Sequence, residues 1–172
     1  MSTHDDLLYS ESITGKWTTA LFVALTAVFS LLFAWRLNGA GWDTLAIVFL
    51  CLGAMFLFYV VNYRKLVIRI TAESLRLTFG VFTWTVPLDN VESAQLDGIA
   101  GFMRYGGAGI HFMSIGKRYR ASFNFLEYPR VVIAFQRKVG LVRDISFTTR
   151  RPDAVLRVIR DATSPGAGSS HA

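Results

Sequence analysis

The chain has little charge and almost no cysteine. Charged residues make up 17% of its 172 residues, whereas ordinary soluble domains carry about a quarter. The single cysteine, Cys51, cannot form an internal disulfide, and one cysteine with three scattered histidines cannot build a zinc site. The composition therefore excludes a disulfide-stapled domain and a structural zinc module, and cysteine usage gives no indication of the redox compartment.

Apolar residues are instead concentrated in two runs near the N-terminus, over 17–35 and 42–63. The first run is free of charge, and the second is free of charge after Asp43. As helices, both are long enough to cross the roughly 30 Å hydrocarbon core of a bilayer, and tryptophan or tyrosine marks their ends. Two buried helices of a soluble protein are the alternative, but such runs are rare there. We predict a transmembrane helical hairpin over 17–63.

The residues around these runs predict their orientation. Segment 1–16 is acidic and no cleavage site of small residues follows the first run, so we expect an uncleaved anchor rather than a signal peptide. Lys16, Arg64 and Lys65 flank one side of the pair, whereas the connection 36–43 carries one arginine. The positive-inside rule then places both termini in the cytoplasm and the chain in the cell membrane, with 1–16 as a cytoplasmic N-terminal segment.

After Lys65 the pattern changes to alternation of apolar and polar residues, which is typical of half-buried antiparallel strands. Strands are predicted over 66–71, 75–79 and 82–86, with Trp84 buried, and further strands over 91–96, 109–114, 118–123, 131–137 and 141–148. A helix with one apolar stripe is predicted to follow Pro152. We therefore expect one domain over 64–162 and a disordered tail over 163–172.

Three stretches resemble a known domain. They are YRKLVIRITAESLRLTFGVFTWTVPLDNVES at 63–93, GGAGIHF at 106–112 and GLVRDISFTTRRPDAVLRVI at 140–159. Together with the hairpin, they resemble the bacterial pleckstrin-homology-like (PH-like) domain of small membrane proteins of unknown function. The resemblance implies an all-β barrel or bent sheet capped by one C-terminal helix. Eukaryotic relatives often bind phosphoinositides through bases around the first hairpin, but here that turn is Ala72-Glu73-Ser74, so no lipid-binding residue is carried over.

Nothing in the sequence predicts catalysis. His111 stands alone in a predicted strand, no histidine pair has metal-ligand spacing, and no local motif joins serine, histidine and aspartate. The glycines over 98–109 lack the lysine of a phosphate-binding loop. We therefore expect a protein that is not an enzyme and has no catalytic, cofactor or metal site.

Positive charge follows the predicted hairpin. Residues 64–172 carry 16 Lys plus Arg and 8 Asp plus Glu, whereas residues 1–63 carry two bases and four acids. A solvated cytoplasmic surface would explain this bias, and contact with anionic lipid headgroups is the more specific interpretation. Nucleic acid is disfavoured as a partner because no binding module is recognisable and a membrane tether opposes it. The candidate headgroup contacts are Arg64, Lys65, Lys117, Arg118 and Arg120.

A second candidate contact element is the glycine-rich segment 97–109, which is long for a hairpin connection. It carries Phe102, Met103, Arg104 and Tyr105, which would contact a partner or fold back over the open end of the sheet. The sequence thus predicts a membrane-anchored docking or scaffold module that contacts lipids, other membrane proteins or a second copy. The alternative is an accessory subunit of a larger membrane complex, in which the hairpin is the functional part.

Overall fold

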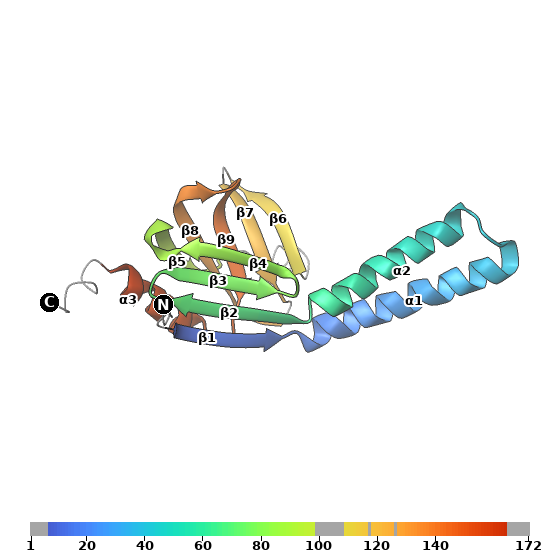
Figure 1. Ribbon diagram of the computed structural model, residues 1–172, viewed down its shortest axis with the longest axis horizontal. Helices are drawn as coiled ribbons and strands as arrows, with labels where there is room; N and C mark the ends of the chain where they lie inside the picture. Colours follow the sequence, from blue (N-terminus) through green and yellow to red (C-terminus); the bar gives the residue numbers. More distant parts are fainter. Residues whose placement is uncertain (1–6, 99–108, 117, 126, 165–172) are drawn as a thin grey trace, which may run out of the picture.

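The computed structural model describes residues 7–98, 109–116, 118–125 and 127–164. A helical hairpin projects from a β-rich body made of two sheets, and the C-terminal helix lies at the end of the body opposite the hairpin (Figure 1).

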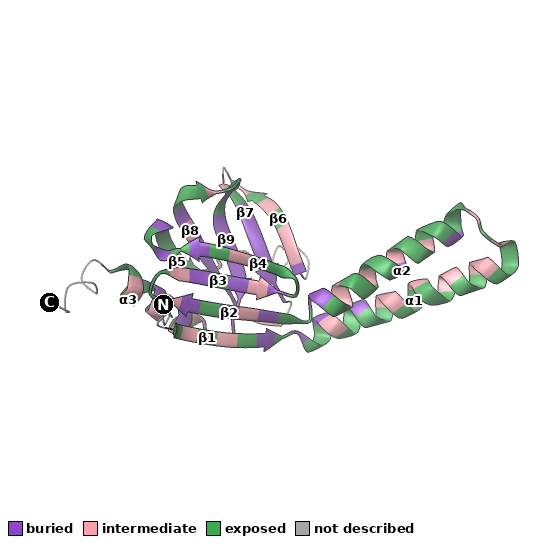
Figure 2. Ribbon diagram, viewed as in Figure 1, coloured by how far each residue is buried: buried purple, intermediate pink, exposed green. Residues whose placement is uncertain are grey.

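The hairpin consists of α1 (Lys16–Ala40) and α2 (Thr44–Asn62). Both helices are long and apolar enough to cross a membrane, and most of their residues are exposed (Figure 2). The two predicted apolar helices are thus confirmed, although α1 continues five residues beyond the expected end at 35. The side chain of Asp43 caps α2 by accepting from the Ala46 N–H at 2.9 Å, and it pairs with Arg36 at 2.6 Å.

The first sheet has the order β1-β2-β3-β4 and is antiparallel throughout. Its strands are β1 (Leu7–Thr14), β2 (Lys65–Thr71), β3 (Ser74–Phe79) and β4 (Phe82–Pro87). The predicted alternation holds in β2 and β3, where every second side chain is fully buried. Trp84 on β4, which we expected to be buried, is only partly covered.

Strand β1 was not expected. We interpreted segment 1–16 as a stretch before the hairpin, but residues 7–14 pair with β2 along its whole length. Ile13 is fully buried, and Glu11 accepts hydrogen bonds from the Thr149 hydroxyl at 2.6 Å and the Arg150 N–H at 3.1 Å. The β-rich body therefore includes residues on both sides of the hairpin, beyond the predicted range 64–162.

The second sheet has the order β5-β8-β9-β7-β6. Strands β7 and β9 run parallel, whereas the other neighbours are antiparallel. All five strands coincide with predicted ones to within two residues at each end. They are β5 (Val91–Leu96), β6 (Gly109–Ile115), β7 (Arg118–Asn124), β8 (Arg130–Val139) and β9 (Val142–Thr148), and the short helix η1 (Leu88–Asn90) precedes β5.

The two sheets share one core and do not close into a barrel, which was one of the two expected forms. Large apolar side chains of the first sheet, such as Leu77 and Phe79, meet those of the second, such as Phe135 and Phe147. Helix α3 (Pro152–Thr163) adds Val155 and Ile159 to this core, as its apolar stripe predicts. Thr163, expected to begin the tail, is the last residue of α3, and 165–172 lie outside the described residues.

Candidate functional site

The helical hairpin joins the body almost without a linker. Gly15 alone separates β1 from α1, and two residues, Tyr63 and Arg64, separate α2 from β2. Thr14 and Lys65, the strand residues nearest the helices, are direct partners in the β1–β2 ladder. The whole hairpin therefore occupies the position of a turn in a β-hairpin, and the body cannot move away from it as it could on a flexible tether.

The connection between β7 and β8 holds the start of α1. Gly15, the N-cap, has no side chain to satisfy the first helical N–H groups. Glu127 supplies the missing acceptor, because its carboxylate accepts from the Trp17 N–H and, at 3.3 Å, from the Thr18 hydroxyl. A Cβ on Gly15 would collide with the Phe125 ring, so the approach is possible only with glycine. A distant carboxylate thus caps α1.

Aromatic side chains connect the end of α2 to the core. The Tyr63 ring lies 5.0 Å from Tyr59 on α2 and 5.1 Å from Phe79 on β3, and Phe79 lies 5.1 Å from Phe125. The β3–β4 turn approaches so closely that a Cβ on Gly80, which has φ +60°, would collide with the backbone of Asn62. Both ends of the hairpin are therefore packed against the body.

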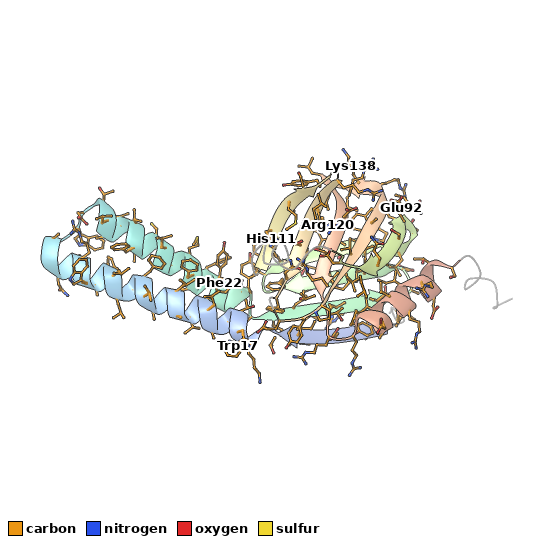
Figure 3. All side chains as sticks on the ribbon, turned by 180° about the vertical axis from the view of Figure 1, so that it is seen from behind. Trp17, Phe22, Glu92, His111, Arg120 and Lys138 are labelled. Carbon is orange, nitrogen blue, oxygen red and sulfur yellow. The ribbon has the colours of Figure 1, made fainter. Side chains whose placement is uncertain are left out.

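Exposed apolar and basic residues surround this junction, and we call them the collar. Val81 at the β3–β4 turn is 72% exposed, Trp17 at the base of α1 is 77% exposed, and Phe82 stacks on Tyr63. Arg64 and Lys65, two of the predicted headgroup contacts, are exposed in the same region. Figure 3 shows Trp17 where α1 meets the body. The collar consists of Trp17, Arg64, Lys65, Val81 and Phe82.

The other predicted headgroup contacts lie elsewhere. Arg120 on β7 is nearly buried, and its guanidinium pairs with Asp144 at 3.3 Å and Asp97 at 3.6 Å. Arg118 donates to Asp144 at 3.1 Å and to Glu92 at 3.0 Å, and these carboxylates raise the pKa of its guanidinium. Arg120 is thus an internal ion-pair partner, whereas Arg118 keeps an exposed edge. Lys117 and the predicted contact loop with Phe102, Met103, Arg104 and Tyr105 lie outside the described residues.

The face of the second sheet that points away from the core carries a buried polar layer. Ser122 and Ser146 are hydrogen-bonded to each other across β7 and β9. Asn124 and His111 lie in the same layer, and neither side chain has a hydrogen-bond partner among the described residues. Burial and the nearby positive charge of Arg130 lower the pKa of His111. Among all the residues that the structure describes, no three His, Cys, Asp or Glu side chains form a group that could hold a metal.

A cavity of about 380 Å³ opens between the β6–β7 and β8–β9 turns. Its bases are Arg118, Lys138 and Arg143, and Lys138 and Arg143 have no acidic partner in the described part of the chain. Neither Lys138 nor Arg143 is among the predicted headgroup contacts. Their charge was visible, but they approach Arg118 only because β7 and β9 lie side by side. We call this the basic pocket, lined by Arg118, Tyr119, Lys138, Leu141 and Arg143.

Comparison with protein-family models, with curated proteins and with solved structures finds no match to this chain. The PH-like resemblance therefore remains a prediction. The junction, the collar and the basic pocket are the features from which a function can be argued.

Proposed function

We propose that the protein is a membrane-anchored docking module at the cytoplasmic face of the cell membrane. The hairpin would hold the body at the bilayer surface, where the body contacts lipid headgroups and protein partners. The observation that carries this proposal is the junction, where Glu127 caps α1 and Tyr63 packs into the core. An anchor that served only to retain a protein at the membrane would not need so rigid an attachment.

The charges at the two ends of the hairpin support the orientation. Lys16, Arg64 and Lys65 flank the end that joins the body. At the opposite end Arg36 is paired with Asp43 at 2.6 Å, so this arginine adds no net charge there. The imbalance favours a cytoplasmic body by the positive-inside rule.

The collar supports contact with the bilayer surface. Trp17, Val81 and Phe82 expose apolar surface beside the bases Arg64 and Lys65. Aromatic and apolar groups at the level of the headgroups, with bases that reach phosphates, are typical of the membrane interface. A fully solvated domain would gain nothing from exposing these side chains.

Photocrosslinking of the full-length chain in native membranes tests this function. A photoreactive residue at Val81, in the collar, should crosslink to phospholipid, whereas the same residue at Ser74, the first residue of β3 at the other end of the strands, should not. The same photoreactive residue at other exposed positions of the body should also crosslink to protein partners, which would give adducts of discrete mass. If Val81 and Ser74 give equally little lipid adduct, the body does not lie on the bilayer and the proposal is wrong.

One observation favours a second function, that of an accessory subunit whose hairpin binds other membrane helices. An apolar groove of about 190 Å³ crosses the two helices, and Ala54, which is exposed on α2, leaves room for a close approach. Exchange of the hairpin for an unrelated one separates the two functions. A docking module would retain the partners crosslinked through its body, whereas an accessory subunit would lose them.

A further inference from the structure

We propose that the basic pocket binds the phosphate of an anionic phospholipid in the leaflet that holds the collar. This inference rests on the proposed function, because it requires the body to lie against the bilayer. It gives that function a ligand class and a site.

The charges of the pocket suit a phosphate. Arg118 is held in place by Asp144 and Glu92, and its side chain is still 38% exposed. Lys138 and Arg143 are exposed, and no acid in the described part of the chain neutralises them. The pocket thus joins one oriented guanidinium with two unpaired bases, and guanidinium and ammonium groups are the usual donors to phosphate oxygens.

Apolar side chains beside these bases indicate a lipid rather than a dissolved anion. Leu141 at the β8–β9 turn is 78% exposed. Phe112, which is 50% exposed, stacks on Tyr119 with ring centroids 6.0 Å apart. Aromatic and aliphatic groups of this kind insert at the headgroup level, while neighbouring bases reach the phosphates. A site for free phosphate would need the bases but not the exposed apolar surface.

The direction of the hairpin brings this pocket toward the bilayer. In Figure 1 the hairpin leaves the body obliquely and rises on the side where the β6–β7 and β8–β9 turns lie. Figure 3, from behind, shows Lys138 at the upper edge of the body, on that same side. When the hairpin stands upright in a membrane, these turns tilt toward the headgroups and α3 points away.

The test uses the full chain in detergent micelles, titrated with a short-chain phosphatidylglycerol, a short-chain phosphatidylcholine and inorganic phosphate. Binding is followed by hydrogen–deuterium exchange of the β6–β7 and β8–β9 turns. The variant is Lys138→Gln with Arg143→Gln. The matched control is Arg69→Gln with Arg76→Gln, because these two exposed arginines are direct partners on the first sheet and removing them changes the net charge equally.

We expect the wild-type turns to be protected by phosphatidylglycerol and not by phosphatidylcholine. At about 1 kcal/mol for each base, the pocket variant should bind phosphatidylglycerol about 30-fold more weakly. The control should change the affinity by less than about threefold, and thermal unfolding should confirm that both variants are folded. Leu141→Ser with Phe112→Ser should weaken the binding of the lipid but not of inorganic phosphate.

Three results would overturn the proposal. Equal losses in the pocket and control variants would mean diffuse attraction without a site. Protection by inorganic phosphate at the same concentration as by phosphatidylglycerol would mean a site for a soluble anion, and no protection by either would mean no anion site. The proposed function is judged separately by the Val81 crosslinks, so a body that crosslinks to lipid without protected turns would refute only the pocket.

Discussion

Glu127 makes its contacts with α1 across more than a hundred residues of sequence. Its carboxylate accepts from the Trp17 N–H and the Thr18 hydroxyl, where Gly15 provides no cap of its own. No sequence pattern indicates this role for Glu127, because a cap is normally sought at the residue before the helix. Side chains that meet only after the sheets have formed cannot be paired from local patterns.

The first prediction concerns this cap. Glu127→Ala should lower the free energy of unfolding of the full chain by about 0.5–2 kcal/mol, the usual cost of a lost N-cap. Glu127→Gln keeps an acceptor and should cost less. Thermal unfolding in detergent measures both, with Glu73→Ala, an exposed turn residue, as the control. A midpoint for Glu127→Ala equal to that of the control would show that the contact does not stabilise the junction.

The second prediction concerns Gly80. Alanine there must adopt φ +60°, which costs about 1–2 kcal/mol, and its Cβ must also displace the Asn62 backbone at the end of α2. Gly116 has the same φ but no neighbour within 4 Å, so Gly116→Ala isolates the cost of the conformation. We expect Gly80→Ala to lower the unfolding temperature clearly more than Gly116→Ala. Equal shifts would mean that α2 moves away from the β3–β4 turn at no cost.

The third prediction concerns pH. Because burial lowers the pKa of His111, the unfolded chain binds a proton more readily than the folded chain. The stability of the wild type should therefore fall as the pH drops below about 6.5, the ordinary histidine pKa, and this loss should end below the folded pKa. His111→Gln removes this contribution, so its midpoint should fall less between pH 7 and pH 5. Parallel curves for the two proteins would show that His111 is hydrated in the folded state.

At the scale of elements, β1 and β2 form a β-hairpin in which the two helices take the place of the turn. Thr14 and Lys65 are paired, so a two-residue turn could replace everything between them. This predicts that a chain in which Asn-Gly replaces residues 15–64 folds as a soluble β domain. A chain that begins at Lys65 lacks β1 and leaves β2 as an exposed edge, so it should aggregate or remain unfolded.

Circular dichroism and heteronuclear NMR spectra distinguish these two chains. The first should give dispersed amide signals and one cooperative transition, even though it lacks the packing of Tyr63 on Phe79. If the chain without β1 folds equally well, then β1 is an accessory strand and the range 64–162 is sufficient as a domain.

Strands β2 to β9 could be predicted, but β1 and the strand order of the second sheet could not. Alternation in β2 and β3 follows from the two-residue period of a sheet, and it correctly marked Leu75 and Leu77 as core residues. No local pattern predicts the parallel pairing of β7 with β9, because it joins strands that are separated by the whole of β8. This pairing brings Asp144 to Arg118 and Arg120 and creates the basic pocket. The ion pairs and the pocket were therefore missed for the same physical reason.

The prediction for the whole molecule concerns its membrane topology, that is, which segments lie on which side of the membrane. Because β1 and β2 pair on either side of the hairpin, segment 7–14 and the body must lie on the same side of any membrane that the hairpin crosses. In a background with Cys51→Ala, a cysteine at Gly39 should react with an impermeant maleimide added outside intact cells. A cysteine at Ser74 should react only after the membrane is opened. The reverse pattern would invert the proposed orientation.

The position of the helical hairpin between two paired strands also constrains how the protein is made. The ribosome synthesises β1 before either helix, and β1 has no strand to pair with until β2 has been completed some fifty residues later. The first sheet can therefore form completely only after both helices have been synthesised and their ends have been brought together. A chain whose helices fail to form a hairpin would keep an open strand edge, and such an edge is what chaperones and proteases recognise. The inserted hairpin thus makes completion of the two apolar helices a condition for completing the β-rich body.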